Sequence, residues 1–196
     1  MTQEKTTGGT RTWNSGKTRS LVLAAVFSSL IAVGAFIRIP LPFLSFSLQT
    51  LFVALASILL ERRWAVISVL IYIAVGLAGF PVFSTGGGIG YIVQPSFGFL
   101  IGFVLWVFVA GTLNARLKKK TVMRLWGIQI IGVLIMYAVA LPYYALIMRF
   151  YQGDPMSAAA LFTYCFAATC PGDILKGWLA AWIGRRMLPQ LRMLHS

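Results

Sequence analysis

Two charged residues stand inside an otherwise apolar stretch near the C-terminus. Asp173 and Lys176 lie three residues apart in Pro171-Gly172-Asp173-Ile174-Leu175-Lys176, so on a helix they share one face. Charged side chains inside a bilayer are costly, and they usually face the protein interior in pairs at functional sites. The pair is therefore the first candidate for a functional site. The alternatives are an ion pair that only fixes helix packing, or a carboxylate that caps the helix after Pro-Gly.

The uncharged segment over residues 79–98 is a second candidate, because it is rich in glycine and aromatic residues. Glycine lets a backbone approach a ligand closely, and aromatic rings add flat apolar contact. No lysine follows the glycines as it does in a phosphate-binding loop. We expect the segment to form a lid or pocket wall, with a tight hairpin as the simpler alternative. Its candidate ligand contacts are Phe83, Gly87, Tyr91 and Gln94.

Three further polar residues follow the first apolar stretch. Arg38, in Arg38-Ile39-Pro40-Leu41-Pro42, either reaches toward lipid headgroups or contacts an anionic group of a ligand. Gln49 and Thr50, near the start of a helix, either pack against neighbouring helices or contact a ligand. We include all three among the candidate ligand-binding residues.

The composition places these candidates in a membrane protein. Of the 196 residues, 59% are hydrophobic and 11% are charged, whereas soluble domains carry about 25% charged residues. A chain this apolar cannot cover itself with a polar surface, which excludes a soluble domain and intrinsic disorder. The net charge of +13 comes from basic residues at the ends of apolar runs. That position is typical of membrane topology, so the expected partner is the lipid bilayer and not nucleic acid.

Six apolar stretches predict an all-α protein with six transmembrane helices. They cover about residues 20–37, 43–60, 64–78, 97–114, 123–148 and 171–188. The helix in the second stretch is expected to start near residues 47–49, and a short helix is expected over 157–168. The polar residues 1–19 predict a disordered cytoplasmic tail, leaving 20–196 as a single transmembrane domain. With the N-terminus inside, fourteen basic residues fall in inner segments and only Arg38 and Arg149 fall outside. Both termini are therefore expected to be cytoplasmic.

The sequence offers little for catalysis or metal binding. The single histidine, His195, is next to last, and Asp173 is the only acidic residue in an expected span. No pair of nucleophile and base can be assembled, so we expect no enzyme activity, no metal and no cofactor. Cys165 and Cys170 are either free or bonded. A purely structural or assembly role is disfavoured by the charged pair and the long glycine loop.

Small residues form stripes on the first expected helix. Ala24, Ser28 and Ala32 are spaced by four, as are Ala25 and Ser29. Such a stripe lets two membrane helices approach closely. It indicates either docking to another membrane subunit or packing inside the protein's own bundle.

Four segments together resemble the BioY family, the S components that capture biotin for energy-coupling factor (ECF) vitamin transporters. They are the segments 33–42, 48–51, 79–103 and 171–176. The resemblance implies an S-component-like bundle of six helices, with biotin under the outer loops and against the last helix. It also implies that Asp173 and Lys176 bind the ligand. Family members often carry an arginine among the loop glycines, but residues 86–88 are all glycine here, so Arg38 is expected to meet the biotin carboxylate.

The resemblance also implies partners and a location. These are a membrane coupling subunit (EcfT), which would dock on Ala24, Ser28 and Ala32, and two cytoplasmic ABC-type ATPases that supply energy. The expected location is the bacterial cytoplasmic membrane. An S component for another vitamin, thiamine or riboflavin, is the alternative.

Overall fold

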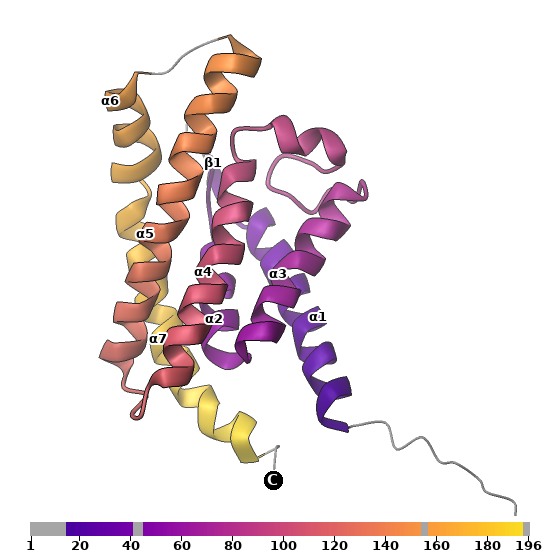
Figure 1. Ribbon diagram of the computed structural model, residues 1–196, viewed down its shortest axis with the longest axis vertical. Coiled ribbons are helices and arrows are strands. Elements are labelled where there is room, and N and C mark those ends of the chain that lie inside the picture. The colour runs from indigo at the N-terminus through magenta and orange to yellow at the C-terminus, as the bar shows by residue number, and fades with distance from the viewer. Residues whose placement is uncertain (1–14, 41–44, 154–156, 194–196) are drawn as a thin grey trace, which may run out of the picture.

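The long apolar stretches become helices, because a helix satisfies its backbone hydrogen bonds within the segment where no water is at hand. In the computed structural model, which describes residues 15–40, 45–153 and 157–193, these helices run roughly along one axis (Figure 1). The longer helices are α1 (Ser15–Phe36), α2 (Gln49–Leu59), α3 (Arg62–Leu77), α4 (Phe97–Arg116), α5 (Val122–Ile147) and α7 (Cys170–Met193). The expected six-helix architecture is confirmed.

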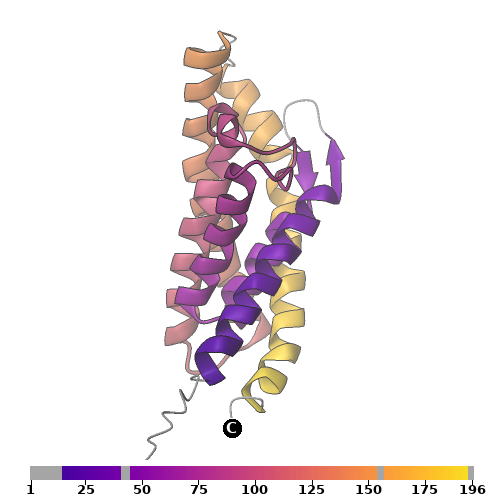
Figure 2. The ribbon, with the colours of Figure 1, turned by 90° about the vertical axis from the view of Figure 1, so that its right-hand side faces the viewer.

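Short elements connect these helices. They are the strands β1 (Arg38–Pro40) and β2 (Ser45–Ser47), the 3-10 helix η1 (Ile89–Val93), the π-helical turns η2 (Met148–Gln152) and η3 (Phe162–Ala167), and α6 (Ala158–Leu161). The two strands pair antiparallel, with Arg38 opposite Ser47. The hairpin and η1 lie at one end of the bundle, and the start of α1 and the end of α7 lie at the other (Figure 2).

The helices differ in how far they could reach across a bilayer. Among the described residues, three stretches are long and apolar enough to cross a membrane: Gly16–Phe36, Phe97–Arg116 and Val122–Gln152. Helix α2 has 11 residues and rises only about 16 Å, against a hydrocarbon core of about 30 Å. Helix α2 begins at Gln49, as predicted for the second apolar stretch, and residues 45–47 before it pair as a strand.

The start of α1 corrects one expected boundary. The helix begins at Ser15, whereas the polar tail was expected to run to residue 19. Lysine, arginine and serine are compatible with a helical backbone. The first turn of α1 does not need to pack against apolar side chains, so these polar residues continue the helix formed by the apolar stretch. Residues 1–14 of the expected tail lie outside the described residues.

Helix α2 occupies the centre of the bundle. It packs against α1, α4 and α7, while α4 packs along α5 and α1 along α3 (Figure 1). Nearly all of its residues are buried, including the polar Gln49 and Thr50 at its N-terminus. Gly34 of α1 permits this packing, because a Cβ there would lie 3.0 Å from the Gln49 backbone. The start of α2 is therefore held firmly inside the protein.

The small residues of α1 face into this bundle. Ala24 and Ser28 are buried and Ala32 is half-buried, whereas Ala25 and Ser29 are exposed. The docking role expected for Ala24, Ser28 and Ala32 stays a prediction. Within the described chain, the small side chains of Ala24 and Ser28 let α1 pack closely in its own bundle.

A buried polar cluster joins α2, α4 and α5 away from the loops. The Gln129 Oε1 atom accepts hydrogen bonds from Trp106 Nε1 at 3.0 Å and from Ser57 Oγ at 3.1 Å. Asn114 Nδ2 donates to the Ser57 carbonyl at 2.9 Å. These bonds link three helices through polar groups that an apolar environment would otherwise leave unpaired.

Candidate functional site

A cavity of about 340 Å³ lies between α2, α4, α5, α7 and the loop that contains η1. Aromatic side chains form much of its wall: Phe46, Tyr72, Tyr91, Phe99, Phe103, Tyr137 and Tyr144. Polar side chains include Ser47, Gln49, Thr50, Gln94, Ser96, Thr169, Asp173 and Lys176. A mostly apolar cavity of this size with a few polar groups is typical of a small-molecule site.

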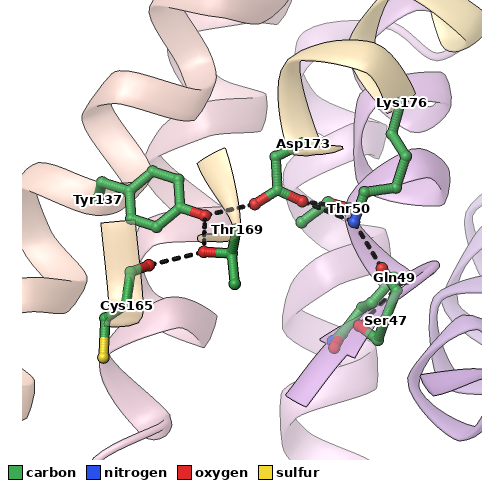
Figure 3. Close-up of polar contacts among 8 residues, drawn as sticks. All are labelled: Ser47, Gln49, Thr50, Tyr137, Cys165, Thr169, Asp173 and Lys176. Carbon is green, nitrogen blue, oxygen red and sulfur yellow. Dashed lines mark hydrogen bonds and ion pairs between the residues drawn. The ribbon is translucent and has the colours of Figure 1, made fainter. Parts of the chain in front are cut away.

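Asp173 is the centre of the polar network. Its Oδ1 atom accepts from Thr50 Oγ1 at 2.9 Å and pairs with Lys176 Nζ at 2.6 Å. Its Oδ2 atom accepts from the Tyr137 hydroxyl at 2.6 Å. Figure 3 shows the carboxylate between Tyr137 on one side and Thr50 and Lys176 on the other. The side chain thus bonds to α2 and α5 and does not cap its own helix.

Lys176 is held as closely as its partner. Its ammonium also donates to the Ser47 carbonyl at 2.6 Å and lies 3.9 Å from the centroid of the Phe46 ring. Both residues of the pair are less than a tenth exposed. A buried charge needs such a paired and hydrogen-bonded environment.

The Asp173 network continues through two residues that sequence reasoning missed. The Tyr137 hydroxyl lies 2.6 Å from Thr169 Oγ1, and Thr169 donates to the Cys165 carbonyl at 2.6 Å. That carbonyl is available because the Thr169 backbone N–H bonds to the Phe166 carbonyl instead. The only sequence signals were a tyrosine in mid-span and a threonine shortly before Pro171.

The loop 79–98 forms one wall of the cavity, as expected. Ser84, Thr85, Tyr91, Gln94, Pro95 and Ser96 all line it. The Tyr91 hydroxyl accepts a hydrogen bond from Ser96 at 3.0 Å, which ties η1 to the start of α4. Tyr91 and Gln94 thus both line the cavity, and their contacts with a ligand stay a prediction.

Two other loop residues support this wall from behind, which corrects their expected ligand contacts. The Phe83 ring is buried between Tyr72 and Tyr91, with centroids 5.4 and 4.3 Å away, and does not line the cavity. It occupies a notch at Gly76, where a Cβ would overlap the ring. Gly87 packs against the Phe80 carbonyl, again with no room for a Cβ. Both residues therefore pack within the loop and stabilise its fold.

Of the remaining candidate ligand-binding residues, two line the cavity and one does not. Gln49 and Thr50 line the cavity, as expected of ligand-binding residues. Arg38 is exposed on β1 and lies outside the cavity lining, which corrects its assignment. The reason is that β2, which carries Phe46 and Ser47, is the strand that borders the cavity. Cys165 and Cys170 are both free and buried.

Comparison with known proteins gives consistent matches over most of the chain. Residues 3–193 match the BioY family. "Probable biotin transporter BioY" from Lysinibacillus sphaericus is 41% identical over 175 residues, which cover 89% of each protein. "Biotin transporter BioY" from Thermotoga maritima is 34% identical, covering 86% of this chain and 95% of that protein. A crystal structure of the S-component for biotin from an ECF-type ABC transporter matches with a TM-score of 0.74 and 28% identity, covering 89% of this chain and 93% of that one.

Proposed function

The chain belongs to the BioY family of biotin transporter subunits, and we propose that its cavity captures biotin for uptake. The observation that carries this assignment is the Asp173 network at one side of an aromatic cavity. Biotin presents a ureido ring with N–H donors and a carbonyl acceptor, an apolar bicycle and a carboxylate tail. Asp173 can accept from the ureido N–H groups, while the aromatic walls contact the bicycle. The protein is thus a binding subunit and not an enzyme.

The loop side of the cavity suits the carboxylate tail. Thr85, Gln94 and Ser96 line that side, and each carries an O–H or N–H donor. Gln94 is exposed, which places it where the tail would meet solvent. This arrangement supports hydrogen bonds from the loop in place of the contact first expected from Arg38.

The orientation in the membrane follows from the two ends of the bundle. We place both termini in the cytoplasm, because the start of α1 and the end of α7 lie at one end and their flanks are basic (Figure 2). The cavity, bordered by the hairpin and η1, then opens toward the outside, where biotin arrives. Residues 1–19 remain a proposed cytoplasmic segment, and 20–196 one transmembrane domain.

The proposed partners are a membrane coupling subunit (EcfT) and two cytoplasmic ABC-type ATPases, in a bacterial cytoplasmic membrane. The related crystal structure is described as a component of an ECF-type ABC transporter, which supports this assembly. The bacterial origin of relatives such as the Thermotoga maritima protein supports the location.

The test is titration of the purified, detergent-solubilised chain with biotin, with thiamine and riboflavin as controls. We expect saturable binding of biotin alone, and its loss in Asp173→Asn. A folded chain that binds thiamine or riboflavin but not biotin would contradict the proposal. The comparisons do not favour that alternative.

A further inference from the structure

A groove of about 370 Å³ lies between α5 and η3, at the side of the bundle formed by α5 and the segment that contains α6 (Figure 1). Ala138 and Pro142, one turn apart on α5, form its floor, which is low because both side chains are small. Leu134 and the rings of Phe162 and Phe166 form its walls, and Leu134 and Phe162 are about half exposed. This α5–η3 groove therefore opens to the surroundings of the protein.

The α5–η3 groove suits an apolar occupant. Among the described residues that line it, only Tyr137 carries a polar side-chain atom, and its hydroxyl bonds to Asp173 and Thr169 instead. The floor lies within Val122–Gln152, a stretch long and apolar enough to cross a membrane. The solvent at that depth is hydrocarbon, so the matching occupant is a hydrocarbon chain.

A cationic side chain lies above the floor of this groove. Arg149, in η2, follows Pro142 by seven residues and Ala138 by eleven, which is close to two and three helical turns, so the three lie along one face. Arg149 is exposed, and within the described ranges it contacts the Phe150 ring but forms no ion pair. Eleven residues rise about 16 Å, about half the thickness of a hydrocarbon core of about 30 Å. A phospholipid with its phosphate at Arg149 would therefore place an acyl chain along the floor.

Tyr137 connects the α5–η3 groove with the ligand cavity, because its side chain lines both. Its ring meets Phe166 edge to face with centroids 5.1 Å apart, and Phe166 stacks on Phe162 at 5.0 Å. An acyl chain packed against these rings would hold Tyr137 where its hydroxyl bonds to Asp173. Lipid in the groove should therefore strengthen ligand binding in the cavity.

We propose that the α5–η3 groove binds one acyl chain of an outer-leaflet phospholipid whose phosphate pairs with Arg149. We also propose that this chain raises the affinity for biotin through Tyr137. The lipid site does not depend on the identity of the ligand, whereas its coupling to biotin rests on the proposed function.

The lipid site is tested in nanodiscs by photo-crosslinking with phosphatidylglycerol that carries a diazirine in its acyl chain, and labelled peptides are quantified by mass spectrometry. We expect more label on residues 134–142 and 162–166 than around Ala74, an exposed residue near the same end of α3. Ala138→Phe fills the floor and should remove this excess, whereas Ala74→Phe, the matched control, should not. Ala138→Leu fills less of the floor and should give a partial loss. Thermal unfolding of each variant separates a filled groove from a lost fold.

The phosphate contact is tested with the same probe. Arg149→Gln should lower the groove label about two- to fivefold. Arg38→Gln removes another exposed cation at the same end of the bundle and should leave the label unchanged. An unchanged groove label in Arg149→Gln would refute the phosphate contact.

Two labelling patterns in the wild type would overturn the lipid site itself. Equal label in the groove and around Ala74, unaffected by Ala138→Phe, would mean that lipid only surrounds the protein. Label around Ala74 but none in the groove would mean that another protein, or a second copy of this chain, covers the groove.

The coupling is tested by calorimetry of biotin binding in detergent, with and without added phosphatidylglycerol. We expect the lipid to raise the affinity of the wild type about fivefold and to leave that of Ala138→Phe unchanged. An equal response in both proteins would refute the coupling while leaving the lipid site intact. A folded wild-type chain that fails to bind biotin would instead contradict the proposed function, and the crosslinking result would still decide the lipid site.

Discussion

The charged pair permits a quantitative test of how the site is held together. Asp173→Asn keeps the shape of the side chain but removes its charge, and Lys176→Met removes the ammonium but keeps most of the stem. In each single variant one buried charge loses the partner that lies 2.6 Å away. In the double variant neither charge remains.

The structure indicates the size of each effect. Removing one partner of a buried ion pair costs about 3–5 kcal/mol. We expect the lower end for Asp173→Asn, because the asparagine oxygen can still accept from Thr50. The asparagine amide can also donate a hydrogen bond to the Tyr137 hydroxyl. That hydroxyl then donates to Thr169, which donates to the Cys165 carbonyl, so none of these polar groups is left without a partner. Lys176→Met should cost about 3 kcal/mol as well, since the carboxylate keeps its two hydroxyl donors.

The double variant distinguishes coupling from independent losses. With both charges gone, no charge is left buried without a partner, so the double variant should be about 3 kcal/mol more stable than the sum of the single losses predicts. The assay is the free energy of unfolding in detergent, from SDS titration without biotin. Lys118→Met, which removes an exposed charge, is the control and should change stability by less than about 0.5 kcal/mol. Single losses that add to within about 0.5 kcal/mol in the double variant would refute this reasoning.

Three further substitutions test other parts of the site and the bundle. Tyr137→Phe removes a donor to the carboxylate and should weaken biotin binding about tenfold in calorimetry; unchanged affinity would contradict a role for this hydroxyl. Gly76→Ala would displace the Phe83 ring and should lower both melting temperature and biotin affinity, whereas Gly127→Ala, which has open space around it, should lower neither. Gln129→Leu leaves a buried indole N–H without its acceptor and should destabilise the fold by about 1–3 kcal/mol in SDS titration, with biotin affinity unchanged; a ligand-binding defect would contradict its separation from the site.

Local sequence features were sufficient for the helices and for the core of the site. Uncharged apolar runs determine helices in a bilayer because no other open segment satisfies its backbone there. Spacing by three places Asp173 and Lys176 on one face, and the cost of an exposed charge turns that face inward. Glycine and aromatic content predicted a folded loop at the cavity, which is what residues 84–96 form.

Contacts between distant segments were decided only by the tertiary structure. Tyr137 is 36 residues from the carboxylate that it binds, and Thr50 is 123 residues away. No local pattern encodes such a pairing. The same limit explains why Arg38 and Phe83 were assigned to the ligand, since residue type shows what a side chain can bind but not which wall of the cavity it joins.

The orientation of α1 shows this division most plainly. Its sequence determined that small residues would recur every four positions and permit close helix packing, but Ala24-Ser28 and Ala25-Ser29 are equally suitable stripes. The structure buries the first and exposes the second. Spacing specifies the faces that a helix possesses, whereas its rotation about its axis depends on the shapes of all the helices that pack against it.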